Sequence, residues 1–477
     1  MDSQLTIYNR DGIHIPDHQI KKEYKAIRQY LLDFHAADSE NIAINQSKDY
    51  RYLLTMMACM EIGIPYVPMK NDYPEDRIAQ IKDDAKFTLL FDDKKMEDVL
   101  SYTGKLLTEL PAEDGNKNVY TIFTSGSTGR PKGVIIQRKA LENFFHFMGE
   151  TFSHVNEKER MLQCTEFNFD LSVQDIALFL TRNVGVFFSN FGNNIFKFAF
   201  EIDTHRISVI NTVPNNLNMF LTDMVAERMD YQCLKHLNIG GARFSYGLYQ
   251  KCLKYFSKEV EIHNFYGPTE ATVYSHYKKI SFDEKCDCLD NNVSIGKTVP
   301  HVTALVVNEH GVAKPNERGE LYIGGMQTMK EYVNNPEQTA QVLVDFENER
   351  FYRTGDLAFI SDAGDFYIVG RADDTNKYRG YRIDLLDIDS YITRLPYVQD
   401  SVTIAIPNET KENQTIGFVI LKEKKTVKEM KQDLSKLLLD YQIPEKILFI
   451  DKYPINSSGK VCRKTLKADY LDSLQKA

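Results

Sequence analysis

The feature that most constrains the fold of this chain is a regular alternation of two sequence patterns up to about residue 280. Apolar residues recur at helical spacing over 20–34, which predicts an amphipathic helix there. The run "NIAIN" at 41–45 predicts a strand, and "DYRYLLTMMACMEIG" predicts a helix that ends near Gly63. Helices that alternate with short apolar strands are typical of α/β sheets flanked by helices. We therefore predict a large N-terminal α/β domain.

The pattern changes twice in the last third of the chain. Beyond residue 290, short strands alternate with Gly and Asn turns, as in "GELYIGG", which predicts an antiparallel or β-barrel-like subdomain. After "GRADDTNKYRG" a smaller unit begins, with helices expected near 385–395 and 426–440. We therefore predict an N-terminal core over 1–372 and a small α+β C-terminal domain over 373–477, joined by a hinge at Asp373.

Charge and composition narrow the class of function. The 477 residues carry a net charge of −9, which argues against a nucleic-acid partner because phosphate binding favours a clustered basic surface. No apolar run reaches the ~18 residues that span a bilayer, so no membrane partner is expected. The seven scattered cysteines fit reduced thiols in the cytoplasm. These features predict a soluble cytoplasmic protein.

One stretch, "VYTIFTSGSTGRPKG" at 119–133, places hydroxyls, glycines and cations directly after a predicted strand. Its small residues can fold back tightly and point N–H and O–H groups at one spot, which suits phosphate oxygens, and Lys132 adds a positive charge. The stretch is not a Walker loop, because Pro131 precedes Lys132. It is not a nucleophile elbow either, because Ser125 stands where a glycine would precede Ser127. From these residues alone, a phosphate-binding loop and a mobile surface loop both stay open.

The same stretch resembles the phosphate-loop signature of the adenylate-forming superfamily, which includes acyl-CoA synthetases, luciferases and the adenylation domains of nonribosomal peptide synthetases. Four more stretches resemble the other motifs of this family in the same order. They are "NFYGPTEAT" for adenine and magnesium, "YRTGDLA" for ribose, "GRADDTNKYRGYRID" for the hinge and "YPINSSGKVCRKTL" for the catalytic lysine. The five motifs occur in the same order as in members of this family. This resemblance implies attack of a carboxylate on the α-phosphate of ATP, giving an acyl-adenylate and pyrophosphate.

The resemblance implies a role for residues in each motif. Those that would hold ATP are Thr124, Ser125, Gly126, Ser127, Thr128, Gly129, Lys132, Asn264, Tyr266, Gly267, Asp356 and Arg371. Within this set, Tyr266 would stack on adenine and Asp356 would accept the ribose hydroxyls. Thr269 would touch the α-phosphate, Glu270 would hold Mg²⁺, and Lys460 would bridge the carboxylate and the α-phosphate, while Lys132 would serve the other phosphates. A carboxylate is already ionised at pH 7, so this chemistry needs cations and aimed donors rather than a base.

Each of these residues also has an ordinary structural interpretation. Asn264 and Tyr266 could pack a turn before Gly-Pro-Thr, and Asp356 could be a turn residue after a glycine. A lysine after Ser-Ser-Gly, such as Lys460, is ordinarily solvated. Asp373 could be an exposed loop residue instead of the pivot about which the small domain rotates for a second half-reaction. The ordered set of motifs favours the catalytic interpretation.

The segment "FNFDLSVQDIALFL" resembles the "FDxS" pattern of the amino-acid-activating branch. By this resemblance Asp170 pairs with the ammonium of the substrate, although it could instead cap a helix. The side-chain pocket would be lined by Leu171, Gln174, Asn211, Asn238, Gly240, Phe265, Val273 and Tyr274. A buried unpaired amide costs ~1–3 kcal/mol, so three amides predict a polar uncharged substrate, such as threonine, serine or glutamine. Mutual pairing of the amides would leave room for alanine or proline.

No carrier-protein serine motif follows residue 466, so we expect a stand-alone enzyme that loads a separate carrier protein in trans through its phosphopantetheine thiol. The region "YRGYRIDLLDI" resembles D-alanine–carrier protein ligases as much as peptide synthetase domains, which keeps D-alanine as an alternative substrate. Two further alternatives stay open: an acyl- or aryl-CoA synthetase, and a non-catalytic nucleotide-binding protein.

Overall fold

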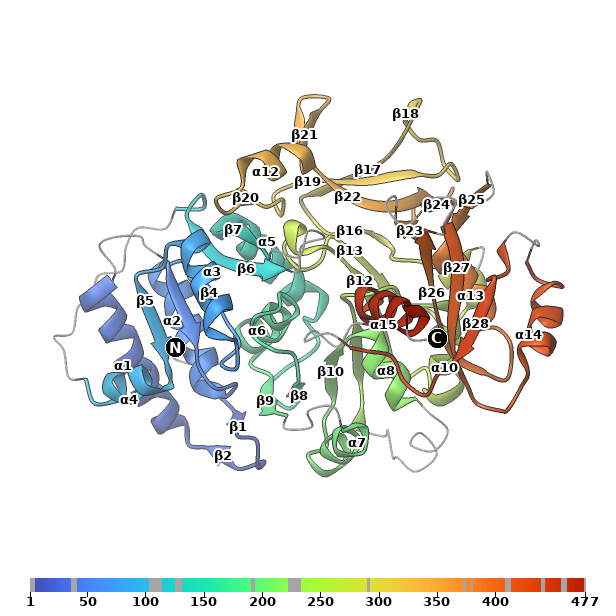
Figure 1. Cartoon of the computed structure of the whole chain (residues 1–477). Coiled ribbons are helices and arrows are strands. Elements are labelled where there is room, and N and C mark those ends of the chain that lie inside the picture. The colour runs from blue at the N-terminus through green and yellow to red at the C-terminus, as the bar shows by residue number, and fades with distance from the viewer. Residues whose placement is uncertain are drawn as a thin grey trace.

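The architecture consists of three large sheets with helices against their faces and a smaller C-terminal unit at one end (Figure 1). This computed structural model describes residues 5–35, 41–102, 114–124, 131–189, 194–221, 233–289, 292–371, 375–378, 381–407, 413–438, 442–455 and 461–475. Within these ranges, no helix is both long enough and apolar enough to cross a bilayer. The predicted α/β class, with a large N-terminal part and a small C-terminal part, is confirmed.

The first sheet has six strands in the order β20-β7-β6-β4-β3-β5. They are β3 (Ile42–Asn45), β4 (Tyr66–Pro68), β5 (Leu89–Asp92), β6 (Asn118–Thr124), β7 (Lys132–Gln137) and β20 (Glu331–Tyr332). The helices between and before them are α1 (Asp17–His35), α2 (Tyr50–Ile62), α3 (Glu75–Ala85) and α4 (Asp93–Leu100). α2 begins where the Asp49 side chain accepts hydrogen bonds from two backbone amides, and it ends at Gly63, whose φ of 80° is left-handed. The helix end expected near Gly63 is confirmed.

The central sheet has nine strands in the order β16-β13-β12-β11-β10-β8-β9-β1-β2. They are β1 (Ile7–Tyr8), β2 (His14–Ile15), β8 (Arg160–Gln163), β9 (Gly185–Phe188), β10 (Val209–Thr212), β11 (His236–Ile239), β12 (Glu261–Tyr266), β13 (His276–Lys279) and β16 (Lys297–Thr298). Its helices are α5 (Arg138–Thr151), α6 (Leu171–Arg182), α7 (Ile195–Thr204), α8 (Pro214–Phe220) and α10 (Tyr246–Tyr255). The neighbours from β12 to β1 all run parallel. Their carboxyl ends therefore meet at one edge, where open α/β sheets bind ligands.

The third sheet is antiparallel, as expected beyond residue 290. Its strands are β17 (Val302–Asn308), β18 (Gly311–Val312), β19 (Gly319–Gly325), β21 (Leu343–Phe346), β22 (Glu349–Ile360) and β23 (Phe366–Arg371), with α12 (Pro336–Val342) between β20 and β21. The short elements η2 (Thr269–Ala271), α11 (Glu284–Asp287), β14 (Cys288–Leu289) and β15 (Asn292–Val293) lie in the connections between β12, β13 and β16 of the central sheet. The pairing of β22 with β23 sets Asp356 opposite Arg371.

The C-terminal unit contains a three-stranded sheet in the order β26-β27-β28. Its elements are β24 (Thr375–Tyr378), β25 (Tyr381–Asp384), α13 (Leu385–Ile392), β26 (Val398–Pro407), β27 (Asn413–Leu421), α14 (Val427–Leu434), β28 (Lys446–Phe449) and α15 (Arg463–Gln475). The helix expected near 426–440 is α14, which begins after the N-cap Thr426 and ends earlier than expected, at Leu434. The proposed boundary at residue 372 and the hinge residue Asp373 lie outside the described residues.

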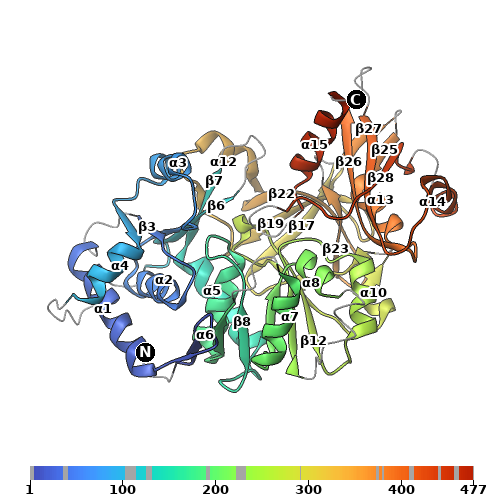
Figure 2. The same ribbon diagram turned by 60° about the horizontal axis from the view of Figure 1, so that its bottom comes forward.

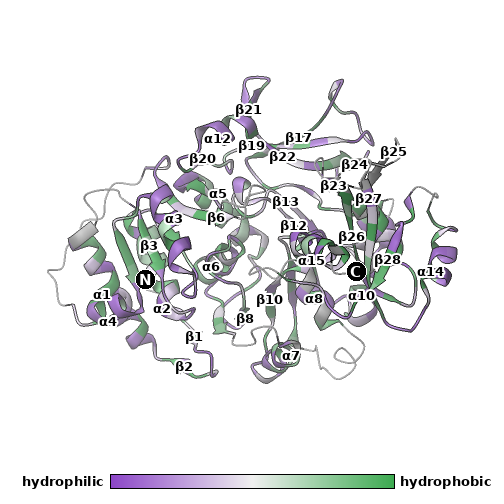
Figure 3. Ribbon diagram, viewed as in Figure 1, coloured by the Kyte–Doolittle hydropathy of each residue, from purple (hydrophilic) through white to green (hydrophobic). Residues whose placement is uncertain are grey.

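The C-terminal unit touches the rest of the chain through polar and aromatic contacts near α8 and α10 (Figure 2). The Arg394 guanidinium lies 5.6 Å from the ring centre of Tyr246, and Asn218 Nδ2 donates a 3.3 Å hydrogen bond to Asp400. Its own buried apolar residues form clusters separate from those of the large part. Hydrophobic residues lie on strands and on helices alike, whereas α12 and α14 at the surface are largely hydrophilic (Figure 3). Each part therefore has its own core.

Candidate active site

A cavity of about 600 Å³ lies between the large part and the C-terminal unit. From the large part it is lined by residues that the sequence assigns to ATP and substrate, namely Asn264, Phe265, Tyr266, Gly267, Asp356 and Arg371. From the C-terminal unit it is lined by Asp389, Ser390, Thr393, Asp400, Ser401, Val402, Val461 and Arg463. The structure thus brings together residues from β12, β22 and β23, which are far apart in the sequence.

Tyr266 and Arg371 hold the carboxylate of Asp356 in the cavity wall. The Tyr266 hydroxyl donates a 2.5 Å hydrogen bond to Asp356 Oδ2, and Arg371 Nη1 donates a 3.1 Å hydrogen bond to Oδ1. Burial, with Asp356 nearby, raises the pKa of Tyr266 well above its usual value, so the phenol stays a donor. A carboxylate offers about four lone-pair sites, so Asp356 can still accept hydroxyl groups from a ligand. This fixed carboxylate fits the expected ribose-binding role.

Asn264 and Gly267 shape the part of the cavity wall where the sequence predicts adenine. Asn264 is buried, and its Nδ2 donates a 2.7 Å hydrogen bond to the carbonyl of Ser294. Its side-chain oxygen is then the atom that can accept a hydrogen bond from an exocyclic amino group. A Cβ at Gly267 would lie 2.4 Å from the carbonyl oxygen of Val273, so a larger residue would displace backbone there.

The phosphate-loop motif forms the connection between two antiparallel strands. Thr124 ends β6, Lys132 begins β7, and the two residues pair with each other across the sheet. The intervening Ser125, Gly126, Ser127, Thr128 and Gly129 lie outside the described residues. Lys132 Nζ lies 5.3 Å from the centre of the Tyr332 ring, which is a cation–π contact.

Glu270 lies close to Lys132 because both contact Tyr332. The Tyr332 hydroxyl donates a 2.6 Å hydrogen bond to Glu270 Oε1, and Glu270 is 9% exposed. Burial, followed by the charge of Glu270, raises the pKa of Tyr332 above its usual range. Thr269 is the first residue of the short helix η2 that carries Glu270. A single carboxylate beside phosphate oxygens is a common Mg²⁺ ligand set, and Glu270 fits it.

The turn after Glu270 has an unusual backbone and a dedicated support. Thr272 and Val273 have φ of 54° and 68°, which side-chain-bearing residues seldom adopt. Gln327 is fully buried, and its Nε2 donates hydrogen bonds to the carbonyls of Ala271, Thr272 and Tyr274 at 3.2, 3.2 and 2.7 Å. Sequence reasoning missed Gln327 and Tyr332, because nothing in the local sequence marks either one. Both supports lie more than 50 residues from the turn they contact.

The predicted substrate pocket is formed by residues that are all buried. The structure brings together Asp170, Leu171 and Gln174 at the start of α6, Asn211 on β10, Asn238 on β11, Gly240 after it, Phe265 on β12, and Val273 and Tyr274 in the turn. Asp170 precedes α6, but its side chain makes no capping hydrogen bond to that helix, so the alternative role as a cap is not supported. Burial, with Asp170 next in effect, raises the pKa of Tyr274 well above its usual value.

The three pocket amides pair with one another. Asn211 Oδ1 accepts hydrogen bonds from Gln174 Nε2 and, at 2.7 Å, from Asn238 Nδ2. Gln174 Oε1 accepts the Tyr274 hydroxyl, and Asn211 Nδ2 donates to Asp175. Asn238 Oδ1 is buried without a hydrogen-bond partner among the described residues. The three amides therefore do not all need a polar substrate side chain as a hydrogen-bond partner.

Asp175 is a third residue that sequence reasoning missed, after Gln327 and Tyr332. It is buried behind the amides, and burial raises its pKa to about 7. Asp175 directly follows Gln174 in the sequence, but the "FDxS" pattern points only to Asp170, so nothing in the sequence marked Asp175. Asp175 fixes Asn211, which in turn orients the other two amides.

Gly240 and Tyr274 close the pocket. The Tyr274 ring stacks on Phe265 with centroids 4.5 Å apart, and a Cβ at Gly240 would lie 2.5 Å from the Tyr274 hydroxyl oxygen. The Tyr274 ring thus occupies the space above Gly240, and little volume remains for a large substrate side chain.

The predicted catalytic Lys460 lies outside the described residues. Ile455 and Val461 form a β-bridge on either side of the segment that contains it, and Val461 lines the cavity. The described chain therefore resumes at Val461 in the cavity wall.

Comparison with known proteins matches the AMP-binding enzyme family over residues 18–333 and the AMP-binding enzyme C-terminal domain over residues 387–460. The chain belongs to the AMP-binding enzyme family. This AMP-binding enzyme is 30% identical to a D-alanine--D-alanyl carrier protein ligase of Streptococcus agalactiae, over 94% of this chain and 93% of that protein. It is 28% identical to bacitracin synthase 3 of Bacillus licheniformis, over 94% of this chain and 7% of that protein. It is therefore an adenylate-forming ligase.

Solved structures show the same fold for this AMP-binding enzyme. Klebsiella oxytoca NpsA in complex with 3-hydroxyanthranilyl-AMSN superposes with a TM-score of 0.83 at 20% identity, covering 98% of this chain and 96% of that one. ATP-bound MatB from Rhodopseudomonas palustris superposes with a TM-score of 0.85 at 18% identity, covering 98% and 96%. These likenesses confirm the predicted fold class.

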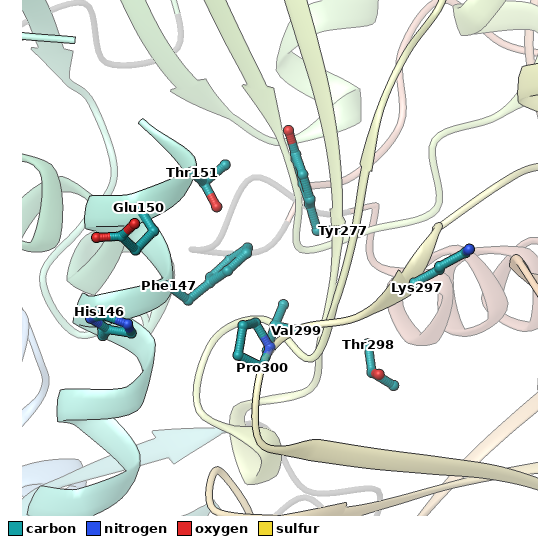
Figure 4. A pocket seen from close by; sticks show the side chains of 9 residues that line it. All are labelled: His146, Phe147, Glu150, Thr151, Tyr277, Lys297, Thr298, Val299 and Pro300. Atoms are coloured by element: carbon teal, nitrogen blue, oxygen red, sulfur yellow. The ribbon is translucent and has the colours of Figure 1, made fainter. Parts of the chain in front are cut away.

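A second, smaller cavity of about 250 Å³ lies beside the C-terminal half of α5. It is lined by His146, Phe147, Glu150, Thr151, Tyr277, Lys297, Thr298, Val299 and Pro300 (Figure 4). Figure 4 shows Tyr277 with its hydroxyl directed away from Val299 and Pro300. This cavity contains none of the residues assigned to ATP or substrate, so the AMP-binding enzyme has its candidate chemistry in the larger cavity.

Proposed function

We propose that this chain is a stand-alone amino acid–carrier protein ligase. It would use ATP to convert an amino acid to an aminoacyl-adenylate and pyrophosphate, and then transfer the aminoacyl group to the phosphopantetheine thiol of a separate carrier protein. The relative from Streptococcus agalactiae, which is named as a carrier protein ligase and matches along nearly its full length, supports this proposal.

In the first half-reaction, an oxygen of the substrate carboxylate forms a bond to the α-phosphorus of ATP. The bond from that phosphorus to the bridging oxygen breaks, and pyrophosphate leaves with the electron pair. Lys132 and the loop from Thr124 to Gly129 would hold the leaving phosphates, and Thr269 and Lys460 would stabilise charge at the α-phosphate. Mg²⁺ bound at Glu270 would neutralise phosphate charge. Asp356 would fix the ribose.

In the second half-reaction, the carrier thiol loses its proton, and its sulfur attacks the acyl carbon. A thioester forms, and AMP leaves with the electrons of the broken acyl–oxygen bond. Rotation of the C-terminal unit about Asp373 would withdraw Lys460 and admit the thiol. The separate cores of the two parts support such a rotation, because each part can keep its fold while the other moves.

The substrate that the pocket supports best is an amino acid with a small side chain. Asp170 is buried at the pocket and would pair with the substrate ammonium. The main support for a small side chain is the position of the Tyr274 ring. It stacks on Phe265, lies over Gly240 and fills the space that a larger side chain would need. Because Gln174 and Asn211 are already paired, an apolar side chain such as that of alanine leaves no new amide unpaired. Alanine, which the sequence left open as an alternative, thus replaces threonine, serine and glutamine as the favoured candidate, and the named relative favours D-alanine in particular.

ATP–pyrophosphate exchange against a panel of D- and L-amino acids tests this proposal. We expect the highest exchange with alanine, glycine or serine, and the D and L forms of alanine settle the stereochemistry. Transfer is then measured by mass spectrometry of a phosphopantetheinylated carrier protein, with CoA as the competing thiol. Highest exchange with leucine or phenylalanine, or with an acid that lacks an ammonium group, would contradict the proposal. Release of AMP with CoA and an aryl acid would favour the acyl- or aryl-CoA synthetase alternative.

A further inference from the structure

A cluster of imidazoles and one carboxylate lies at the amino edge of the central sheet, opposite the edge that faces ATP. His236 and Glu261 are the first residues of the neighbouring parallel strands β11 and β12, and they pair with each other in register. His154 follows the end of α5 and reaches the same place. None of these residues belongs to the motifs that define the adenylation site. We propose that His154, His236 and Glu261 bind a transition-metal ion of the zinc class.

The distances in this cluster fit a metal site. His154 Nε2 lies 3.1 Å and His236 Nδ1 lies 3.4 Å from the same carboxylate oxygen, Glu261 Oε2. The three ligand atoms all lie within 4.8 Å of one another. In a tetrahedral zinc site with bonds of about 2.0–2.2 Å, neighbouring ligand atoms are about 3.3–3.5 Å apart. Small side-chain shifts would therefore place all three atoms around one ion, with a fourth position open to water.

An unsatisfied buried nitrogen points to a ligand. His236 is 5% exposed, and its Nδ1 has no hydrogen-bond partner among the described residues. A buried polar atom left unpaired costs ~1–3 kcal/mol, and coordination of an ion would remove this cost. His263 Nε2 also lies near the cluster, 3.5 Å from Glu261 Oε2, while its Nδ1 is engaged with the Tyr277 hydroxyl at 2.9 Å. It can support the carboxylate from the interior side.

The second oxygen of the Glu261 carboxylate is already held by a neighbouring side chain. Lys279 Nζ binds the other oxygen, Oε1, at 2.6 Å, which leaves Oε2 directed at the imidazoles. A hydrogen bond of this kind to the distal oxygen is usual for ligating carboxylates.

The ligand set also selects the class of ion. Imidazole nitrogens favour Zn²⁺, Cu²⁺, Ni²⁺ or Co²⁺, whereas Mg²⁺ prefers oxygen ligands only. The Mg²⁺ used with ATP would therefore not compete for this site. A bound ion would join the turn after α5 to the first residues of β11 and β12, two strands whose later residues include Asn238 and Asn264. Its expected effect is to stabilise the base of the sheet.

Isothermal titration calorimetry of the EDTA-treated protein with ZnCl₂ tests the site. The informative variants are His154→Ala, which changes a half-exposed side chain, and Glu261→Gln. The matched control is His310→Ala, a surface histidine outside the cluster with its side chain 83% exposed. We expect one Zn²⁺ per chain for the wild type and the control, with affinity at least about 10-fold weaker in His154→Ala and Glu261→Gln. We also expect Zn²⁺ to raise the melting temperature of the wild type more than that of His154→Ala.

Thiols are the main competing ligands, and Co²⁺ separates them from imidazoles. A nitrogen- and oxygen-ligated Co²⁺ ion gives visible absorption without a thiolate charge-transfer band. Loss of this absorption in His154→Ala, with normal folding by circular dichroism, would support the site. Unchanged Zn²⁺ affinity in His154→Ala and Glu261→Gln, a thiolate band in the wild type, or no stoichiometric binding would overturn it.

Discussion

The hydroxyl of Tyr332 donates a 2.6 Å hydrogen bond to Glu270, the carboxylate proposed to hold Mg²⁺. The same ring lies 5.3 Å from the ammonium of Lys132, the proposed phosphate ligand. One aromatic side chain therefore sets the positions of an acidic and a basic group that would act on the same triphosphate. β20 places it there through its pairing with β7, which begins at Lys132.

Tyr332→Phe removes this hydrogen bond and keeps the ring under Lys132. A hydrogen bond to a charged group contributes about 1.5–3 kcal/mol, so we expect the Mg²⁺ concentration for half-maximal exchange to rise by about 10-fold or more. The measurement is ATP–pyrophosphate exchange over a range of Mg²⁺ concentrations. Tyr322→Phe, in the antiparallel sheet, is the matched control. An unchanged Mg²⁺ dependence would show that Tyr332 does not position Glu270.

Gln327→Leu leaves the turn after Glu270 without its support. The change removes three hydrogen bonds to backbone carbonyls and the acceptor of a 2.8 Å hydrogen bond from Asn143. We expect the free energy of unfolding to fall by about 2–4 kcal/mol, and the Michaelis constant for ATP to rise. Urea unfolding and exchange kinetics measure the two effects. Gln341→Leu on the exposed surface of α12 should change neither; a stable Gln327→Leu protein with normal kinetics would contradict the expectation.

Tyr274→Ala should widen the substrate pocket. It removes the ring that covers Gly240 and also frees Gln174 Oε1. We expect exchange with leucine or methionine to rise relative to alanine by roughly 10-fold, which corresponds to about 1.4 kcal/mol of relative binding. The amino-acid panel measures this ratio. Gly240→Ala makes the opposite change and should lower exchange with every substrate; a wild-type ratio in Tyr274→Ala would place the specificity elsewhere.

Lys460→Ala tests the proposed cation of the C-terminal unit. Removing one group that stabilises transition-state charge costs roughly 100-fold in rate, so adenylation should fall by at least that much. ATP binding, measured by equilibrium titration, should change little, because the other proposed ATP ligands are on the large part. Lys452→Ala, an exposed lysine of the same unit, is the control. Near-normal exchange in Lys460→Ala would remove this residue from the mechanism.

We expect the free energy of unfolding to fall in mild acid because of His276. Burial lowers its pKa from 6.5 to about 3, so between these values the unfolded chain binds a proton that the folded chain does not. The stability from this residue is therefore complete above about pH 6.5 and falls as the pH is lowered. Between pH 7 and pH 5 the expected loss is about 2 kcal/mol.

Urea unfolding of the wild type and of His276→Gln at both pH values checks this loss. The variant should retain about 2 kcal/mol more of its stability on acidification, because glutamine does not titrate. Equal losses in the two proteins would mean that His276 is protonated in the folded state.

The sequence predicted the features that depend on neighbouring residues. The end of α2 at Gly63 follows from one left-handed glycine, and the strand before the phosphate loop follows from its own apolar residues. The motif residues Tyr266, Asp356 and Arg371 were predicted to meet at one site, and the structure brings them into contact. Here the family resemblance supplied the long-range information that spacing alone could not.

The sequence could not predict contacts that depend on distant elements and on side-chain rotamers. Tyr332 reaches Glu270 from β20, and Gln327 reaches the following turn from the loop after β19; no local pattern marks either residue. The pairing of Gln174 with Asn211 likewise depends on how α6 packs on β10. That pairing changed the expected substrate, because the composition of a pocket does not say which of its polar atoms are already satisfied. The end of α14 at Leu434, short of the expected residue 440, was also not predicted.

The contact of the C-terminal unit with α8 and α10 has one more consequence. Its contacts there include a guanidinium over the Tyr246 ring and an amide–carboxylate bond between Asn218 and Asp400. Water can replace such polar contacts at small cost in free energy, so these two contacts do little to oppose separation of the two surfaces. In the proposed reaction, the C-terminal unit would present two different surfaces to the same bound adenylate in succession, one while the adenylate forms and one while the thioester forms.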